Sequence, residues 1–290
     1  MKIAYIVDST AGLKDELKQH PDVYVLNLTI NFANGDVYED STEDSKVKAF
    51  YQRLKEETQL PTTAQPSPGE YYQLMDQLIA NNYQAVIVIN LSSQLSGTFQ
   101  TSQMVLNEYS DRLMVTAIDS KGTSVVIENM LEQALEMQNM GLTFKEINEK
   151  LNWLAEESHI YMVIEDLNNL VKSGRLSSAN AFLGSLLQIK PLLEFTDTGA
   201  VQVIEKIRTE KKVYKRWEEI VENALQKFPN GIHLRFAHGD AYEAVAAVQE
   251  TMKKKFPQIK SFGIGYLTPV VGVHGGNGVK GMAIIPVATH

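Results

Sequence analysis

The sequence predicts an α/β protein made of two domains. Short apolar runs of strand length alternate through the first half with longer segments in which apolar residues recur every three or four positions. That alternation is typical of a parallel sheet with crossover helices. A length of 290 residues suits two domains of ordinary size. A content of 44% hydrophobic and 21% charged residues is that of a globular chain.

The first half of the chain contains the clearest strand and helix patterns. We expect strands at 3–7, 85–89 and 113–118 and helices at 43–58, 69–82 and 122–140. Thr143 with Glu146 three positions later forms a capping box, which predicts a further helix that ends near residue 158. We therefore place the N-terminal α/β domain at residues 1–158 and the C-terminal α/β domain at 159–290.

The second half is expected to mix strands and helices. After a strand at 160–164, a helical region is expected to reach roughly residue 189. The turn at Asp197-Thr198-Gly199 predicts a hairpin. The remaining patterns give strands at 192–196, 201–207, 261–266 and 281–287 and helices at 210–227 and 240–255, the last with Asp240 as its N-cap.

Charge and composition exclude several classes of function. The chain has 27 Lys and Arg against 35 Asp and Glu, and its formal charge of −8 argues against binding to nucleic acid, which needs a basic surface. No apolar run approaches the ~18 residues of a membrane span, and Asp8 comes too early for a signal peptide. We therefore expect a cytoplasmic protein without an integral membrane segment. The absence of cysteine excludes thiolate metal sites and cysteine nucleophiles.

Hydroxyl side chains gather in loops that adjoin the expected strands and helices. "NLSSQLSGTFQ" (90–100) follows a strand, "PTTAQPSPGEYY" (61–72) precedes a helix, and "DSTAGL" (8–13) follows the first strand. In α/β sheets ligands bind where strands end and helices begin, because loop amides and helix N-termini offer free donors. We expect the three loops to share one polar site, although Ser93 or Ser96 could serve only as a helix cap.

Catalytic and nucleotide-binding motifs are poorly represented. No G-x-S-x-G motif accompanies any of the six histidines. "GGNGVKG" (275–281) has the glycines of a phosphate loop but not the Walker spacing. We expect no cofactor, no metal and no catalysis by this chain.

Seven motifs occur in order along nearly the whole chain. They are "DSTAGL", "PTTAQPS", "SSQLSGTFQ", "DSKGTS", "VKSGRLS", "LLQIKPLLEF" and "GVHGGNG". Together they resemble the DegV family of bacterial proteins. The resemblance implies two α/β domains with a long-chain fatty acid, such as palmitate or oleate, held between them. It also implies a binding subunit of bacterial fatty-acid kinase, which presents the carboxylate to a separate ATP-dependent kinase subunit that makes acyl phosphate.

The same resemblance implies which residues form the site. The carboxylate would be bound by hydroxyls of the threonine and serine loops, with a histidine as a further donor; these residues are Thr63, Ser96, Ser93 and His274, beside Thr62, Gly97 and Gly275. Charge-assisted hydrogen bonds from hydroxyls suit a carboxylate. Arg175 would lie near the mouth, where it contacts the kinase subunit or the transferred phosphoryl group.

Other interpretations stay open at this point. Ser96 could be the nucleophile of an acyl hydrolase or transferase with His274 as its base, although no third group that orients the histidine is evident. The protein could also be a lipid sensor with a different partner. Arg175 could simply follow a helix that ends at Gly174 and bind its last carbonyls.

Overall fold

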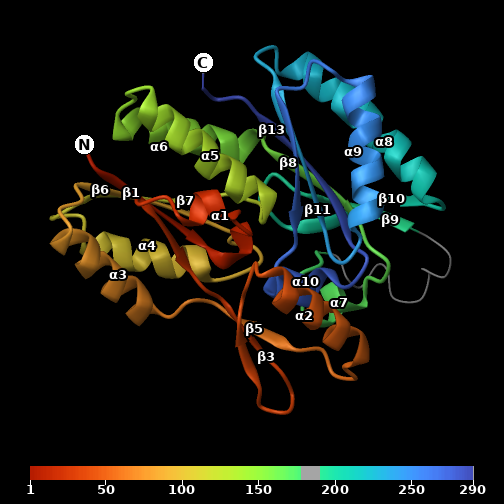
Figure 1. The fold of residues 1–290 in the computed structure, drawn as a ribbon, viewed down its shortest axis with the longest axis horizontal. Coiled ribbons are helices and arrows are strands. Elements are labelled where there is room, and N and C mark those ends of the chain that lie inside the picture. Colours follow the sequence, from red (N-terminus) through yellow and green to blue (C-terminus); the bar gives the residue numbers. More distant parts are fainter. Residues whose placement is uncertain (178–189, 290) are drawn as a thin grey trace.

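Across residues 1–177 and 190–289, which the computed structural model describes, the strands form sheets of four, six and three strands (Figure 1). The N-terminal sheet has the order β2-β1-β6-β7 and all its pairs are parallel. Its strands are β1 (Ile3–Asp8), β2 (Val23–Leu26), β6 (Ala85–Asn90) and β7 (Met114–Asp119). β1 and β6 are buried along their whole length, which explains their continuous apolar sequences.

Helices cover both faces of the N-terminal sheet. Side chains alternate along a strand, so Ala4 and Ile6 pack toward α3 (Pro68–Ala80) and α4 (Thr98–Glu108). Ile3, Tyr5 and Val7 point the other way and pack with α5 (Val125–Asn139) and α6 (Phe144–Glu157). The sheet therefore lies between two helical layers, as Figure 1 shows.

The C-terminal sheet has the order β10-β9-β8-β13-β11-β12 and is antiparallel except for the pair β11 and β12. Its strands are β8 (His159–Val163), β9 (Lys190–Phe195), β10 (Val201–Ile207), β11 (Ile232–His238), β12 (Ser261–Tyr266) and β13 (Lys280–Pro286). α8 (Glu210–Lys227) and α9 (Tyr242–Lys255) cover its outer face through Trp217 and Val245.

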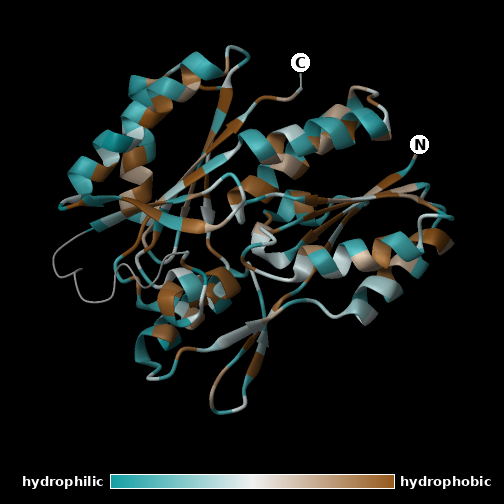
Figure 2. Ribbon diagram, turned by 180° about the vertical axis from the view of Figure 1, so that it is seen from behind, coloured by the Kyte–Doolittle hydropathy of each residue, from teal (hydrophilic) through white to brown (hydrophobic). Residues whose placement is uncertain are grey.

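The two sheets share the layer formed by α5 and α6. Both helices contact strands of the N-terminal sheet and also β13. One core cluster accordingly joins Val7 and Ile89 of the first sheet to Leu193 and Ile285 of the second. Figure 2 shows hydrophobic colour along these inner strands and polar colour on the outward faces of the outer helices. The halves of the chain thus bury one common core.

A smaller unit packs where the two sheets meet. Its sheet has the order β4-β3-β5. The unit consists of β3 (Thr29–Asn31), β4 (Val37–Glu39), β5 (Thr62–Ala64), α2 (Asp44–Glu56), α7 (Asn168–Lys172) and α10 (Pro269–Gly275). Ile30, Phe50 and Val273 lie in its core. Segments about 240 residues apart are brought together here.

Most of the expected elements are confirmed. The first sheet is parallel, β9 and β10 form the hairpin around Asp197-Thr198-Gly199, and the Thr143–Glu146 capping box opens α6. α2, α3, α8, β7, β8, β12 and β13 lie within a few residues of their expected ranges. α5 begins three residues later than expected, at Val125, because Ser124 has a non-helical backbone.

Several expectations were wrong or incomplete. Asp240 does not cap α9: its φ is +57°, the N-cap is Ala241, and the Asp240 carboxylate instead pairs with Lys55. The expectation of a loop at the start of 61–72 was wrong, because Thr62–Ala64 pair with β3 and form β5. β2, β3, β4, α10 and the fully buried β11 were not anticipated. Of the helical region expected up to about residue 189, the structure describes the short α7, and 178–189 lie outside the described residues. β7 is the last strand of the first sheet along the chain and β8 is the first strand of the second. The domain division at 158 stays a prediction.

Candidate functional site

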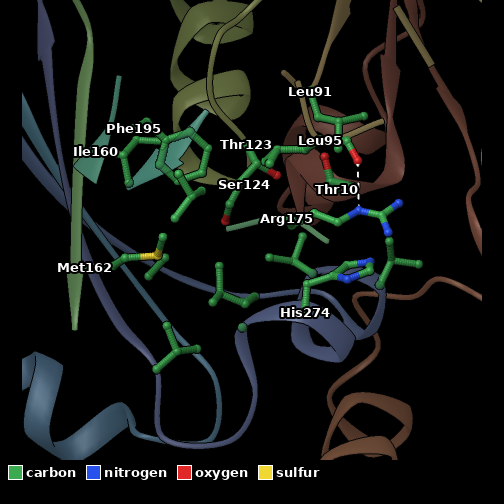
Figure 3. A pocket seen from close by; sticks show the side chains of 18 of the residues that line it. Thr10, Leu91, Leu95, Thr123, Ser124, Ile160, Met162, Arg175, Phe195 and His274 are labelled. Carbon is green, nitrogen blue, oxygen red and sulfur yellow. Dashed lines mark hydrogen bonds between the residues drawn. The ribbon is translucent and has the colours of Figure 1, made fainter. Parts of the chain in front are cut away.

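A cavity of about 190 Å³ lies between the two sheets and the smaller unit. Its wall is formed by the loops after β1 and β6, the start of α5, strands β8, β9 and β13, and helix α10. Figure 3 shows Arg175 and His274 toward one side of it and Ile160, Met162 and Phe195 toward the other. The cavity therefore has a polar end and an apolar end.

Asp8 organises the loops at the carboxyl edge of the N-terminal sheet. Its fully buried carboxylate accepts hydrogen bonds from the backbone N–H of Leu91 at 2.7 Å, the backbone N–H of Thr10 at 3.1 Å and the Thr10 hydroxyl at 2.5 Å. Burial raises the pKa of Asp8, and these donors act against that rise. Thr10 and Leu91, both in the cavity wall, are thus held by one side chain.

The four hydroxyls of the serine loop have different roles. Ser92 donates to the carbonyl of Gly199 at 2.7 Å and so ties the loop to the β9–β10 hairpin. Ser96 lines the cavity with Gly97, and its hydroxyl lies 2.8 Å from that of Thr98 at the start of α4. Ser93 is not among the described residues of the cavity wall; its backbone N–H donates to Asp119. Neither Ser93 nor Ser96 is the N-cap of α4, which is Gly97.

Thr63 reaches the cavity from the middle of β5. The strand pairs with β3, and alternation along it directs Thr63 inward while Thr62 is exposed on the opposite face. Thr62 accordingly does not appear among the described lining residues. The Thr63 hydroxyl lies 3.0 Å from Nε2 of His274.

His274 is carried on α10, together with Gly275 in the cavity wall. The N-terminus of α10 is held by Asp40, which accepts from the N–H of Val270 at 3.0 Å and from the Ser9 hydroxyl at 2.8 Å. Burial, and secondarily the positive charge of Arg175, lower the pKa of His274 to about 4. The imidazole is therefore neutral at pH 7, and its Nδ1 is buried without a hydrogen-bond partner in the described part of the chain.

Arg175 follows a helix end that fixes its backbone. Gly174 has φ +73°, and the N–H groups of Gly174 and Arg175 donate to the carbonyls of Val171 and Leu170, the pattern of a Schellman cap on α7. The Arg175 Nε donates to the carbonyl of Leu95 at 3.2 Å, drawn as the dashed line in Figure 3. The prediction that Gly174 ends a helix is confirmed, and Arg175 lies half-buried in the cavity wall.

Thr123 and Ser124 also line the cavity, although the sequence analysis did not assign them to the site. They stand at the start of α5, directly after β7, so the rule that ligands gather at strand ends applies to them as well. Ser124 has φ +57° and ψ −129°, a backbone conformation that costs a non-glycine residue about 1–3 kcal/mol. The sequence signal that could have found them is the hydroxyl-bearing motif "DSKGTS" between β7 and α5.

The hydroxyl and imidazole groups of the polar end are bonded to different partners. His274 Nε2 is bonded to Thr63, and the Ser96 hydroxyl is bonded to Thr98, so serine and histidine are not paired as a nucleophile and its base. Within residues 1–177 and 190–289, no group of three His, Asp or Glu side chains is arranged to hold a metal ion. No described helix combines the length and the apolar character needed to cross a bilayer.

A family model described as "Uncharacterised protein, DegV family" matches residues 2–287. The DegV domain-containing protein of Listeria innocua is 37% identical over 281 residues, which are 97% of each chain. The DegV domain-containing protein of Streptococcus pneumoniae is 32% identical over 293 residues, covering 99% of this chain and 100% of that protein.

Solved structures with the same fold are similar over nearly their full length. A fatty-acid-binding DegV family protein from Streptococcus agalactiae is 32% identical, with a TM-score of 0.90 and 99% of each chain covered. DegV, a fatty-acid-binding protein from Bacillus subtilis, is 31% identical, with a TM-score of 0.86 and 98% of this chain and 99% of that chain covered.

Proposed function

Because this chain belongs to the DegV family, we propose that it binds a long-chain fatty acid in the cavity between its sheets and presents the carboxylate to a separate ATP-dependent kinase subunit. The observation that carries the proposal is the division of the cavity into an end with hydroxyl, imidazole and guanidinium groups and an end lined by Ile160, Met162 and Phe195. An amphipathic anion matches that division. The proteins from Streptococcus agalactiae and Bacillus subtilis, which bind fatty acid, support it.

The carboxylate is proposed to accept hydrogen bonds from Thr63 and Ser96, with His274 behind them. A threonine hydroxyl has one proton to donate. In the tautomer of His274 that carries its proton on Nε2, the imidazole donates to Thr63 across the 3.0 Å contact, and the Thr63 proton stays available for the ligand. Arg175 adds a permanent positive charge nearby.

The acyl chain is proposed to supply most of the affinity. Burial of about 15 methylene groups at about 0.8 kcal/mol each contributes on the order of 10 kcal/mol before ordering costs. The hydroxyls then orient the head, while the tail holds the ligand. This division lets the protein retain its fatty acid through the tail while it presents the carboxylate to the kinase subunit.

The test is mass spectrometry of lipid extracted from the purified protein, together with titration of palmitate and oleate. We expect about one long-chain fatty acid per chain and formation of acyl phosphate when the loaded protein is mixed with a fatty-acid kinase catalytic subunit and ATP. Absence of extracted lipid together with failure to bind either acid would contradict the binding proposal. Binding without acyl phosphate would contradict only the kinase role and favour a lipid sensor.

The absence of catalysis by this chain is tested separately. A chromogenic acyl ester is incubated with the wild type and with Ser96→Ala. We expect no turnover by either protein, because Ser96 lacks a bonded base. Turnover that disappears in Ser96→Ala would replace the binding proposal by an acyl hydrolase.

A further inference from the structure

Two buried hydroxyls in the cavity wall have no partner among the residues that the structure describes. The Oγ1 of Thr123 and the Oγ of Ser124 make no hydrogen bond to any residue that the structure describes. The two residues are 8% and 3% exposed, and both line the cavity. A buried hydroxyl without a partner is unfavourable unless a ligand or water satisfies it.

The local structure does not use these hydroxyls. Ser124 occupies the N-cap position of α5, yet its side chain accepts no capping hydrogen bond. Its φ of +57° and ψ of −129° lie in a region that side chains other than glycine rarely adopt. Strained residues of this kind cluster at binding sites. Helix capping therefore does not account for a serine at this position.

The pair lies between the polar and the apolar end of the cavity. In Figure 3, Thr123 and Ser124 stand between the side of Arg175 and His274 and the side of Ile160 and Phe195. In the proposed binding mode a carboxylate at the polar end already has the hydroxyls of Thr63 and Ser96 as donors, with His274 behind Thr63. Thr123 and Ser124 then face the chain of the ligand rather than its head.

The chemistry of the pair suits a neutral oxygen. The positive end of a 15-residue helix attracts oxygen lone pairs. The single carboxylate of the ligand is held at the polar end in the proposed function, so the group that meets Thr123 and Ser124 is a neutral one. A hydroxyl or carbonyl oxygen can accept hydrogen bonds from both hydroxyls.

We infer that Thr123 and Ser124 form a second polar subsite, which binds a neutral hydroxyl or carbonyl oxygen within the acyl chain of a modified fatty acid. The inference rests on the proposed function, because the carboxylate must occupy the other end. It adds a chemical preference: a chain that carries oxygen at the matching distance from the head satisfies both hydroxyls, whereas an unmodified chain leaves them without partners.

The experiment compares palmitate with monohydroxypalmitates whose hydroxyl is placed at successive carbons, each titrated by displacement of a fluorescent fatty acid. The measured quantity is the ratio of each hydroxy acid's affinity to that of palmitate. We expect one position, or two adjacent positions, to exceed the others by about three- to tenfold, the effect of one or two hydrogen bonds. Ser124→Ala and Thr123→Val should flatten this profile.

Two further variants control for folding and for hydroxyl loss as such. Ser124→Gly removes the hydroxyl and relaxes the backbone at φ +57°, so it should also flatten the profile while its thermal midpoint does not fall. Ser110→Ala removes an exposed hydroxyl beyond α4 and should leave the profile unchanged.

A flat profile in the wild type, with palmitate bound, would overturn the second subsite alone. Failure of palmitate itself to bind would overturn the proposed function as well.

Discussion

Thr63 and Ser96 reach the cavity from two different elements of the N-terminal part of the chain. Thr63 comes from a strand and Ser96 from the loop before α4, and each has a neighbour that holds its hydroxyl, His274 and Thr98 respectively. Their hydroxyls are therefore positioned before any ligand arrives. Such preorganisation reduces the entropy lost on binding.

Removal of these hydroxyls should weaken binding of the carboxylate. Thr63→Val and Ser96→Ala should each lower fatty-acid affinity by about 1–3 kcal/mol, and the double variant by more, because a charged acceptor loses its donors. The measurement is titration with palmitate, with circular dichroism to verify the fold. Unaltered affinity and unaltered acyl-phosphate formation in the double variant would show that the head lies elsewhere.

Arg175 should separate binding from presentation. Because the tail is proposed to dominate affinity, Arg175→Ala should retain its fatty acid yet support little acyl-phosphate synthesis with the kinase partner and ATP. Arg175→Lys keeps the charge but not the planar fork, so it should rescue the synthesis only in part. The measurements are lipid content by mass spectrometry and acyl-phosphate yield.

The alternative outcomes for Arg175 are distinct. Its Nε already donates to the Leu95 carbonyl, and its guanidinium also bonds to Ser173. Full kinase support by Arg175→Ala would assign the residue to these structural contacts alone. Loss of bound lipid would instead place it among the groups that hold the ligand.

At the scale of elements, the β9–β10 hairpin and the serine loop are fitted to each other. Gly199 has φ +85°, and a Cβ added there would lie 2.3 Å from the Oγ of Ser92 and 3.0 Å from the Cα of Lys121. The hairpin thus approaches the loop so closely that no side chain fits at residue 199. This contact joins the C-terminal sheet to the loop that carries Ser96.

Gly199→Ala should therefore destabilise the protein more than a matched glycine substitution. Gly35 has φ +91° with nothing within 4 Å of an added Cβ. Gly35→Ala should therefore lower the free energy of unfolding only by the cost of a left-handed backbone at alanine, about 1–2 kcal/mol. Gly199→Ala should lower the free energy of unfolding by the same backbone cost and by about 1–3 kcal/mol more, because the added Cβ overpacks the contact. Urea unfolding measures both, and equal losses would contradict the close contact.

At the scale of the whole molecule, buried titratable groups couple stability to pH. Burial lowers the pKa of His233, His238 and His274 to about 4 each, below the value of about 6.5 in an unfolded chain. The folded state therefore binds fewer protons than the unfolded state between pH 6.5 and 4. Stability from these residues is complete above about pH 6.5 and is lost as the pH falls.

Asp40 acts in the opposite direction. Burial raises its pKa to about 6, so the folded state gains stability as the pH falls through that value. Between pH 7 and pH 5 each histidine should lower the free energy of unfolding by on the order of 2 kcal/mol, and Asp40 should return about 1 kcal/mol. Asp8 and Glu128, whose pKa values burial also raises, act in the same direction as Asp40. Urea unfolding at the two pH values measures this difference. Asp40→Asn should make the loss steeper, whereas equal stability at both values would contradict the shifts.

The sequence by itself determined the local elements and the identity of the polar loops. Continuous apolar runs gave the parallel strands, and the Thr143–Glu146 pair gave the start of α6, because these signals depend on neighbours within a few residues. β11 was missed, although it is buried throughout, because short apolar runs are ambiguous without tertiary context.

Only the tertiary structure decided which of these loops meet and which side chains face the cavity. Thr63 and His274 are 211 residues apart and touch because β5 and α10 pack in the same small unit. Thr62 and Ser93 lie beside lining residues in sequence but outside the described wall, because strand alternation and a backbone bond to Asp119 turn them away. Ser124 enters the wall through a backbone angle that sequence patterns do not reveal. Short sequence motifs therefore supply the polar side chains, whereas packing between distant segments brings those side chains together in one site.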